Sequence, residues 1–150
     1  MTRPETSLPS DFDLEEGYAC FHPAGNVSLE EAVMLCKQAI LFARKSGIGR
    51  LLIDATQLGG FPSPSVGDRY WIARDFAFAA KALVTVSFAF QPYLLDPERF
   101  GVTVATNIGM KTNVFGTKTE ALAWLRNQPD LSKTSQHRND DEGNSVQNAE

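Results

Sequence analysis

Histidine and cysteine are scarce in this chain of 150 residues, which contains two of each. His22 is the one histidine within the regularly patterned part of the sequence, and His137 lies near the C-terminus. A Ser-His-Asp set or a multi-histidine metal site therefore has little to draw on. Cys20 and Cys36 lack metal-ligand spacing, and we expect them to be reduced and buried. We predict a protein without catalytic residues, metal or cofactor.

Long apolar runs are also absent. No stretch approaches the roughly 20 uninterrupted apolar residues that a membrane-spanning helix needs, and the first ten residues lack the apolar core of a signal peptide. The expected location is the cytoplasm. Nucleotide-binding fingerprints are missing too, because no Gly-x-Gly-x-x-Gly run occurs and no Lys-Ser or Lys-Thr follows Gly59 and Gly60. These two glycines indicate a turn.

The net charge of −4 excludes an obvious nucleic-acid binder, and a hydrophobic content of 43% fits one soluble domain with a real core. Much of the charge lies at the end of the chain, where residues 129–150 hold five acidic and two basic side chains. That segment has too few large apolar residues to offset the entropy of ordering. We predict a flexible N-terminus over residues 1–10, a domain over 11–128 and a disordered acidic tail over 129–150.

What remains is a regular alternation of strands and helices. Residues 11–22 predict a hairpin, and capping boxes at Ser28–Glu31 and Thr117–Glu120 each open a helix. Asp96 as cap and Pro97 at the first helical position predict another helix, whose inner line is Phe100, Val104 and Ile108. The order predicts an α/β fold with a mixed sheet and packed helices. The predicted helices cover residues 28–47, 65–81, 96–109 and 117–128, and the later strands cover 50–54, 83–90 and 112–115.

Five short segments carry a resemblance to a known family. They are Gly-Asn-Val-Ser-Leu-Glu-Glu (25–31), Leu-Leu-Ile-Asp-Ala (51–55), Asp-Pro-Glu-Arg-Phe-Gly (96–101), Val-Phe-Gly (114–116) and Glu-Ala-Leu-Ala-Trp-Leu (120–125). Through them the chain resembles the STAS superfamily, and more closely the SpoIIAA-like group of small bacterial proteins, also described as STAS/SEC14-like. The resemblance implies a STAS-like mixed sheet with an N-terminal hairpin and about four packed helices.

The founding members of that superfamily are anti-sigma-factor antagonists, in which a serine of an Asp-Ser-Ser-Gly motif is phosphorylated to block partner binding. Here residues 60–67, Gly-Phe-Pro-Ser-Pro-Ser-Val-Gly, stand in place of the motif and lack its acidic residue. The resemblance makes Ser63 and Ser65 candidate phospho-acceptors. A simpler interpretation is that Ser65 is the N-cap of the next helix, with Asp68 three residues on.

The helix predicted from Ser65 to Lys81 has aromatic residues on two sides. At about 100° per residue, one broad apolar arc forms, and Trp71 and Phe78 fall on the opposite, charged side. Large aromatics among charges need some other cover, such as a neighbouring helix, a partner chain, a ligand or a lipid surface. Phe61 and Tyr93 would extend the same patch. The apolar arc comprises Val66, Tyr70, Ile72, Ala73, Phe76, Ala77, Ala79 and Ala80.

Three polar side chains are further candidates. Arg69 lies at the edge of the arc, where its stem can cross apolar surface and carry the guanidinium to the mouth of the loop, as an anion contact or as an ordinary surface arginine. Asp54 ends a buried strand, a place where α/β folds hold functional side chains. An enzyme using Asp54 or His22 would require these residues to cluster with Arg69 in one pocket.

Two functional hypotheses follow. The leading one is a non-enzymatic, STAS-like regulatory module that docks a protein partner, or a second copy of itself, through the loop and helix 59–81. The alternative is a binder of an apolar small ligand or a membrane surface, as the SEC14 likeness implies. In that case the aromatics would form a lid over a cleft under Phe76, Phe88 and Phe90.

Overall fold

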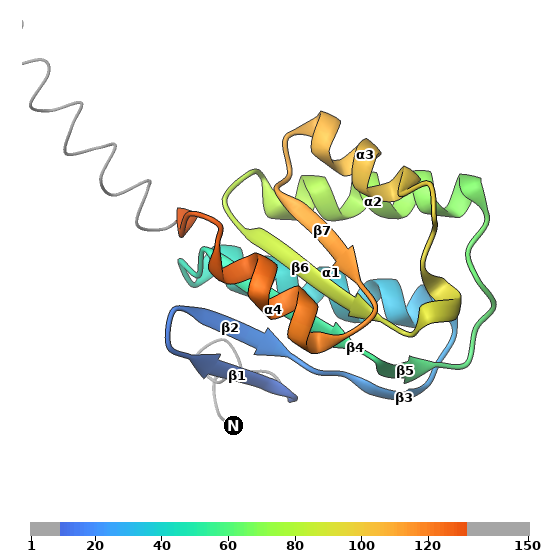
Figure 1. Ribbon diagram of the computed structural model, residues 1–150, viewed down its shortest axis with the longest axis horizontal. Helices are drawn as coiled ribbons and strands as arrows, with labels where there is room; N and C mark the ends of the chain where they lie inside the picture. Colours follow the sequence, from blue (N-terminus) through green and yellow to red (C-terminus); the bar gives the residue numbers. More distant parts are fainter. Residues whose placement is uncertain (1–9, 132–150) are drawn as a thin grey trace, which may run out of the picture.

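The computed structural model describes residues 10–131, which form an α/β fold around a mixed five-stranded sheet (Figure 1). The strand order is β1-β2-β4-β6-β7, with β1 antiparallel to β2 and every other pair parallel. The predicted α/β class with an N-terminal hairpin is therefore confirmed. The strands are β1 (Phe12–Glu15), β2 (Tyr18–Phe21), β4 (Arg50–Ala55), β6 (Thr85–Phe90) and β7 (Thr112–Phe115).

Four helices cover the two faces of this sheet. Helices α1, α2 and α3 share one core with alternate residues of the central strands, such as Ile53 and Phe88. Helix α4 covers the other face, where Ala121 and Leu125 pack on Leu52. The alternation of side chains along each strand separates these two cores. The helices are α1 (Leu29–Lys45), α2 (Val66–Ala80), α3 (Phe100–Ile108) and α4 (Lys118–Arg126).

A second, two-stranded sheet continues from the ends of β2 and β4. Strand β3 (Ala24–Asn26) pairs in parallel with β5 (Gln57–Gly59), and the sequence analysis missed both strands. The turn at Gly60 follows, with a φ of +98° that favours glycine. A Cβ at Gly60 would lie 2.9 Å from the backbone nitrogen of Val27. The predicted turn is therefore present, and its glycine allows two backbones to approach closely.

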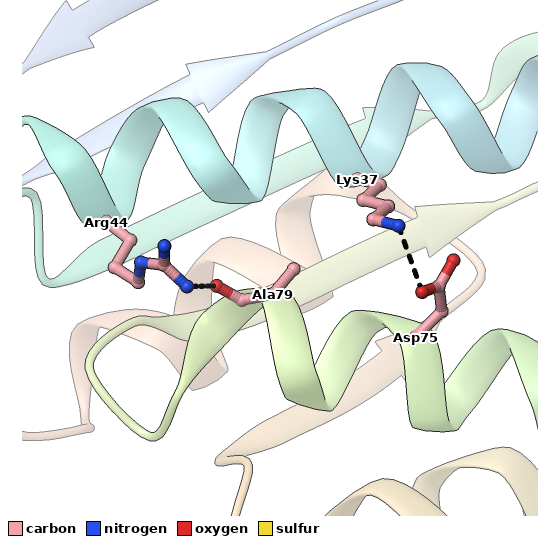
Figure 2. A network of polar contacts seen from close by, with 4 residues as sticks. All are labelled: Lys37, Arg44, Asp75 and Ala79. Carbon is pink, nitrogen blue, oxygen red and sulfur yellow. Dashed lines mark hydrogen bonds and ion pairs between the residues drawn. The ribbon is translucent and has the colours of Figure 1, made fainter.

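Polar contacts join α2 to α1 along the side of both helices (Figure 2). The Lys37 ammonium lies 3.0 Å from a carboxylate oxygen of Asp75. Arg44 donates a hydrogen bond of 2.8 Å to the carbonyl oxygen of Ala79 in the last turn of α2. These contacts position α2 against α1 in addition to the shared apolar core.

The start of α3 differs from the prediction. Asp96 and Pro97 precede the helix, and Arg99, with a φ of +55°, is its N-cap residue. The Asp96 carboxylate accepts hydrogen bonds from the amides of Glu98 and Phe100, which closes a turn and delays the helix until Phe100. The predicted inner line is wrong at one position, because Ile108 is exposed while Ala105 is buried.

The predicted N-terminal segment 1–10 and tail 129–150 lie almost entirely outside the described residues. Within residues 10–131, no helix is long and apolar enough to cross a membrane.

We predict that alanine is tolerated less well at Gly60 than at Gly25. Both glycines have positive φ values, but the space beside Gly25 is open, whereas a Cβ at Gly60 meets backbone. Gly25→Ala should lower the free energy of unfolding by roughly 1–2 kcal/mol through backbone strain alone. Gly60→Ala should cost roughly 1–3 kcal/mol more, because neighbouring backbone must shift. Urea unfolding of both variants measures the difference, and equal losses would contradict the close approach.

Candidate functional site

An apolar cavity of about 500 Å³ lies between the sheet and helices α1, α2 and α3 and opens to solvent. Its volume lies within the range of roughly 300–1,000 Å³ that is typical of small-molecule sites. Most of its wall is hydrocarbon from every element on this side of the sheet. The apolar lining includes Leu29, Ala32 and Val33 of α1, Ile72, Ala73 and Phe76 of α2, Phe88 and Phe90 of β6, and Val102 and Ala105 of α3.

Three phenylalanines form one wall of the cavity. The rings of Phe76 and Phe88 stack with their centroids 5.5 Å apart, and those of Phe88 and Phe90 stack at 5.3 Å. Phe88 and Phe90 lie on the same face of β6 because strand side chains alternate. The alternative hypothesis places a cleft under these same three residues, and the structure has a cavity there.

Small side chains leave the space beside this wall open. Ala73 on α2 and Ala105 on α3 both line the cavity and are buried. Gly101 also lines it, and a Cβ added there would lie 3.9 Å from the carbonyl oxygen of Arg69, so α2 and α3 approach closely at this point. The two helices therefore meet through small residues and roof the cavity without filling it.

The charged lining residues are Arg69, Asp96 and Arg99. Arg69 donates hydrogen bonds to the carbonyl oxygen of Pro64 (3.2 Å), to that of Leu94 (3.3 Å) and to the Ser63 hydroxyl (2.9 Å). The guanidinium thus reaches the loop before α2, as its position in the first turn predicted, and also holds the loop before α3.

Asp96 is held in the ionised form by its local hydrogen bonds. The amides of Phe100 and Glu98 donate to its carboxylate at 2.9 and 3.0 Å, and these bonds lower its pKa below the ordinary value, with a smaller contribution from the charge of Arg69. Asp96 therefore anchors the turn before α3.

Both cysteines are buried and unbridged, as predicted. Burial raises the pKa of the Cys36 thiol to about 12, and Cys36 lines the cavity. Burial is also the main cause that raises the pKa of Cys20 to about 11. Both remain neutral thiols near pH 7, which are poor nucleophiles.

The outer face of α2 carries exposed aromatic side chains. Trp71 is 38% exposed and Phe78 is 54% exposed, so neither side chain is buried within residues 10–131. The guanidinium of Arg74 lies 5.2 Å from the ring centroid of Phe78 and 5.7 Å from that of Tyr70. The Trp71 indole donates a hydrogen bond of 3.3 Å to Asp68, which contributes to the lowered pKa of that carboxyl after the larger effect of the Ser65 amide.

Two residues of the predicted inner arc are exposed to solvent. Val66 and Tyr70 are exposed, whereas Ala73, Phe76, Ala77, Ala79 and Ala80 are buried. The inner face of α2 is therefore narrower than predicted, because the first turns of the helix extend past the core.

The other residues expected to extend the patch lie at the cavity or beside it. Phe61 is half-buried and lines the cavity. Tyr93 is exposed, and its hydroxyl donates a hydrogen bond of 2.7 Å to the carbonyl oxygen of Phe61. Of the two candidate phospho-acceptors, Ser65 is the N-cap of α2 in a capping box with Asp68, and Ser63 accepts the bond from Arg69.

Asp54 and His22 do not line the cavity with Arg69. Asp54 accepts hydrogen bonds from the amide and the hydroxyl of Thr56, at 3.2 and 2.7 Å. His22 lies 2.7 Å from a carboxylate oxygen of Asp13 on the neighbouring strand β1. The clustering that an enzyme built on these residues would require is not present.

Arg99 is a lining residue that was not predicted from the sequence. Its place in the lining follows from the turn at Asp96, in a segment that was predicted to be helical already.

No family model matches this chain, and comparison with curated proteins and with solved structures finds no match either.

We predict that Asp96→Ala lowers the free energy of unfolding by about 1 kcal/mol at pH 7, the usual loss for a cap-like carboxylate. Because the folded-state pKa of Asp96 is depressed, its contribution is present above the ordinary carboxyl pKa of 3.8 and is lost as pH falls through the folded value. The gap between wild type and variant should therefore narrow below pH 4.

Urea unfolding from pH 7 to pH 3 tests this dependence. Asp96→Asn is the matched control, because it keeps one acceptor oxygen without a titrating group. A gap between wild type and Asp96→Ala that stays constant down to pH 3 would contradict the assignment.

Proposed function

We propose that this protein is a non-enzymatic cytoplasmic binder of an apolar small ligand, held in the cavity under α2 and α3. The observation that carries the proposal is a cavity of about 500 Å³ with a mainly hydrocarbon lining. Its charged groups are confined to Arg69, Asp96 and Arg99. Such a combination of apolar walls and a few polar groups is typical of ligand sites.

Burial of hydrocarbon supplies the affinity in this proposal. Each methylene group removed from water contributes about 0.8 kcal/mol before the costs of association. The stacked rings of Phe76, Phe88 and Phe90 are already ordered by the core, so little side-chain entropy is lost on binding. The resemblance to the SpoIIAA-like, STAS/SEC14-like group supports the same class of ligand.

We predict that filling the cavity weakens binding of a neutral apolar probe, 1-aminoanthracene. Ala73→Phe and, separately, Ala105→Phe place a phenyl ring where only a methyl group now lines the wall. Each should weaken probe binding at least about tenfold, a change of roughly 1.4 kcal/mol. Fluorescence titration measures the affinity, and circular dichroism establishes that each variant is folded.

Phe78→Ala is the matched control, because Phe78 lies on the outer face of α2 and is not part of the lining. Its affinity for the probe should equal that of the wild type. If folded Ala73→Phe and Ala105→Phe proteins bind the probe as the wild type does, the cavity is not the site.

A second candidate function is protein docking through the outer face of α2, with another copy of this chain as partner. The exposure of Trp71, Phe78 and Tyr70 around Arg74 supports it, since aromatic and arginine side chains dominate interface hot spots. Covering Trp71 and Phe78 would remove a few hundred Å² from water, about several kcal/mol before association costs. A two-fold symmetric dimer places the same patch on both sides.

Sedimentation velocity over a range of protein concentrations tests this candidate. Trp71→Ala and Phe78→Ala should each weaken a dimer at least about tenfold. Leu14→Ala is the control, because Leu14 is an exposed apolar residue on β1 rather than on α2. A wild-type protein that stays monomeric, or a dimer unaffected by both changes, would rule out self-docking through this face.

A further inference from the structure

We infer that the ligand is a single-chain amphiphile with an anionic head group, whose head lies at Arg69 and Arg99 and whose chain lies along the phenylalanine wall. This inference rests on the proposed function and adds the chemistry of the ligand. It follows from three features of the cavity: the position of its charged residues, the N–H donors that have no partner, and the volume available to an alkyl chain.

The charged lining residues are grouped around one segment of the chain. Arg69 is bonded to the carbonyl oxygen of Leu94, and the amide of Arg99 is bonded to the carbonyl oxygen of Asp96. Residues 94–99 therefore bring Arg69, Asp96 and Arg99 to the same side of the cavity. The remaining lining, which includes Phe76 and Phe88, carries no charged side chain and is mostly apolar. A ligand that matches this wall is itself polar at one end and apolar over the rest.

The guanidinium of Arg69 is held in place by hydrogen bonds and still has N–H groups that can bind a ligand. A guanidinium carries five N–H groups in a planar fork. Three of these N–H groups donate hydrogen bonds to Pro64, Leu94 and Ser63. The other two have no hydrogen-bond partner within residues 10–131. Because three bonds fix the plane of the guanidinium, an oxyanion can bind the remaining N–H groups without ordering the side chain.

Arg99 supplies a second positive charge. Arg99 is an exposed residue of the cavity lining, and its side chain makes no hydrogen bond or ion pair with any residue of the described range 10–131. As the N-cap residue of α3, it is held by the backbone at the point where the loop joins the helix. Because the side chain is exposed and has no such bond within this range, its guanidinium is free to bind a ligand head group.

Asp96 does not cancel this positive character. Its two carboxylate oxygens accept hydrogen bonds from the amides of Glu98 and Phe100, which stabilise its single negative charge, and that charge is set against two positive ones in the lining. No other acidic residue lines the cavity. Two guanidinium groups against one satisfied carboxylate favour an anionic head over a neutral or cationic one.

The available volume selects a single chain. A cavity of about 500 Å³ is in the size range for one drug-sized molecule. A phospholipid with two acyl chains is much larger than this space. A carboxylate on one alkyl chain satisfies both the charge and the size of the site.

Isothermal titration calorimetry at low ionic strength and pH 8 tests the inference with matched ligands of one chain length: dodecanoate, dodecanol and dodecylammonium. Dodecanoate should bind at least about tenfold more tightly than dodecanol, the difference expected for one charge-assisted pair. Dodecylammonium should bind most weakly of the three. Arg99→Gln and Arg69→Gln should each reduce the preference for dodecanoate to about threefold or less.

Two further variants serve as controls for the loss of charge and for the loss of folding. Lys45→Gln removes an exposed cation at the end of α1, outside the lining, and should leave the preference unchanged. Arg69→Lys retains the charge if loss of the loop contacts unfolds Arg69→Gln, and Arg99→Gln tests the site independently. Circular dichroism establishes whether each variant is folded.

The possible results distinguish the inference about the anionic head group from the proposed function, which is apolar ligand binding in the cavity. If dodecanol binds as tightly as dodecanoate, the anionic head is wrong and the apolar binding site stands. If dodecanoate is preferred equally by wild type and both folded arginine variants, the head group is not at Arg69 and Arg99. If none of the three ligands binds, both the inference and the proposed function fail.

Discussion

The stacking of Phe76 on Phe88 is the contact on which the rest of this site depends. It sets α2 over the sheet through one large side chain, while the neighbouring inner positions of α2 are alanines. Lys37 and Arg44 then hold the same helix against α1 through polar contacts. A helix supported at a few points, with small residues between them, covers the sheet and leaves a void beneath it.

Much of the fold could be predicted because its signals are local. The capping box at Ser28 and the glycine after α1 bound that helix, and the buried strands β4 and β6 are short apolar runs. The signals failed where two local structures compete for one motif. Asp96 followed by proline suits a helix start, but its carboxylate instead closes a turn that puts Arg99 ahead of α3. Strands β3 and β5 were missed because three residues cannot show an alternation.

The candidate site was predictable in part. Helical periodicity placed Trp71 and Phe78 on the outer face of α2, and an angle along a helix depends on sequence alone. The cavity depends instead on how far α2 and α3 stand from β6, a distance that no single segment encodes. Sequence indicates which residues are small, such as Ala73 and Ala105, but not whether a neighbour fills the space that they leave.

The lining of the cavity includes Pro64, Pro92 and Pro97, and hydrogen bonds from Arg69 join the two segments that contain these residues, the one before α2 and the one before α3. Proline has a fixed φ, and each bridging hydrogen bond removes further backbone freedom. Most of the entropy of ordering these two segments is therefore lost during folding. In the proposed function, a ligand therefore meets two segments whose shape is already set by folding, so they select it by their fixed shape and not by closing over it.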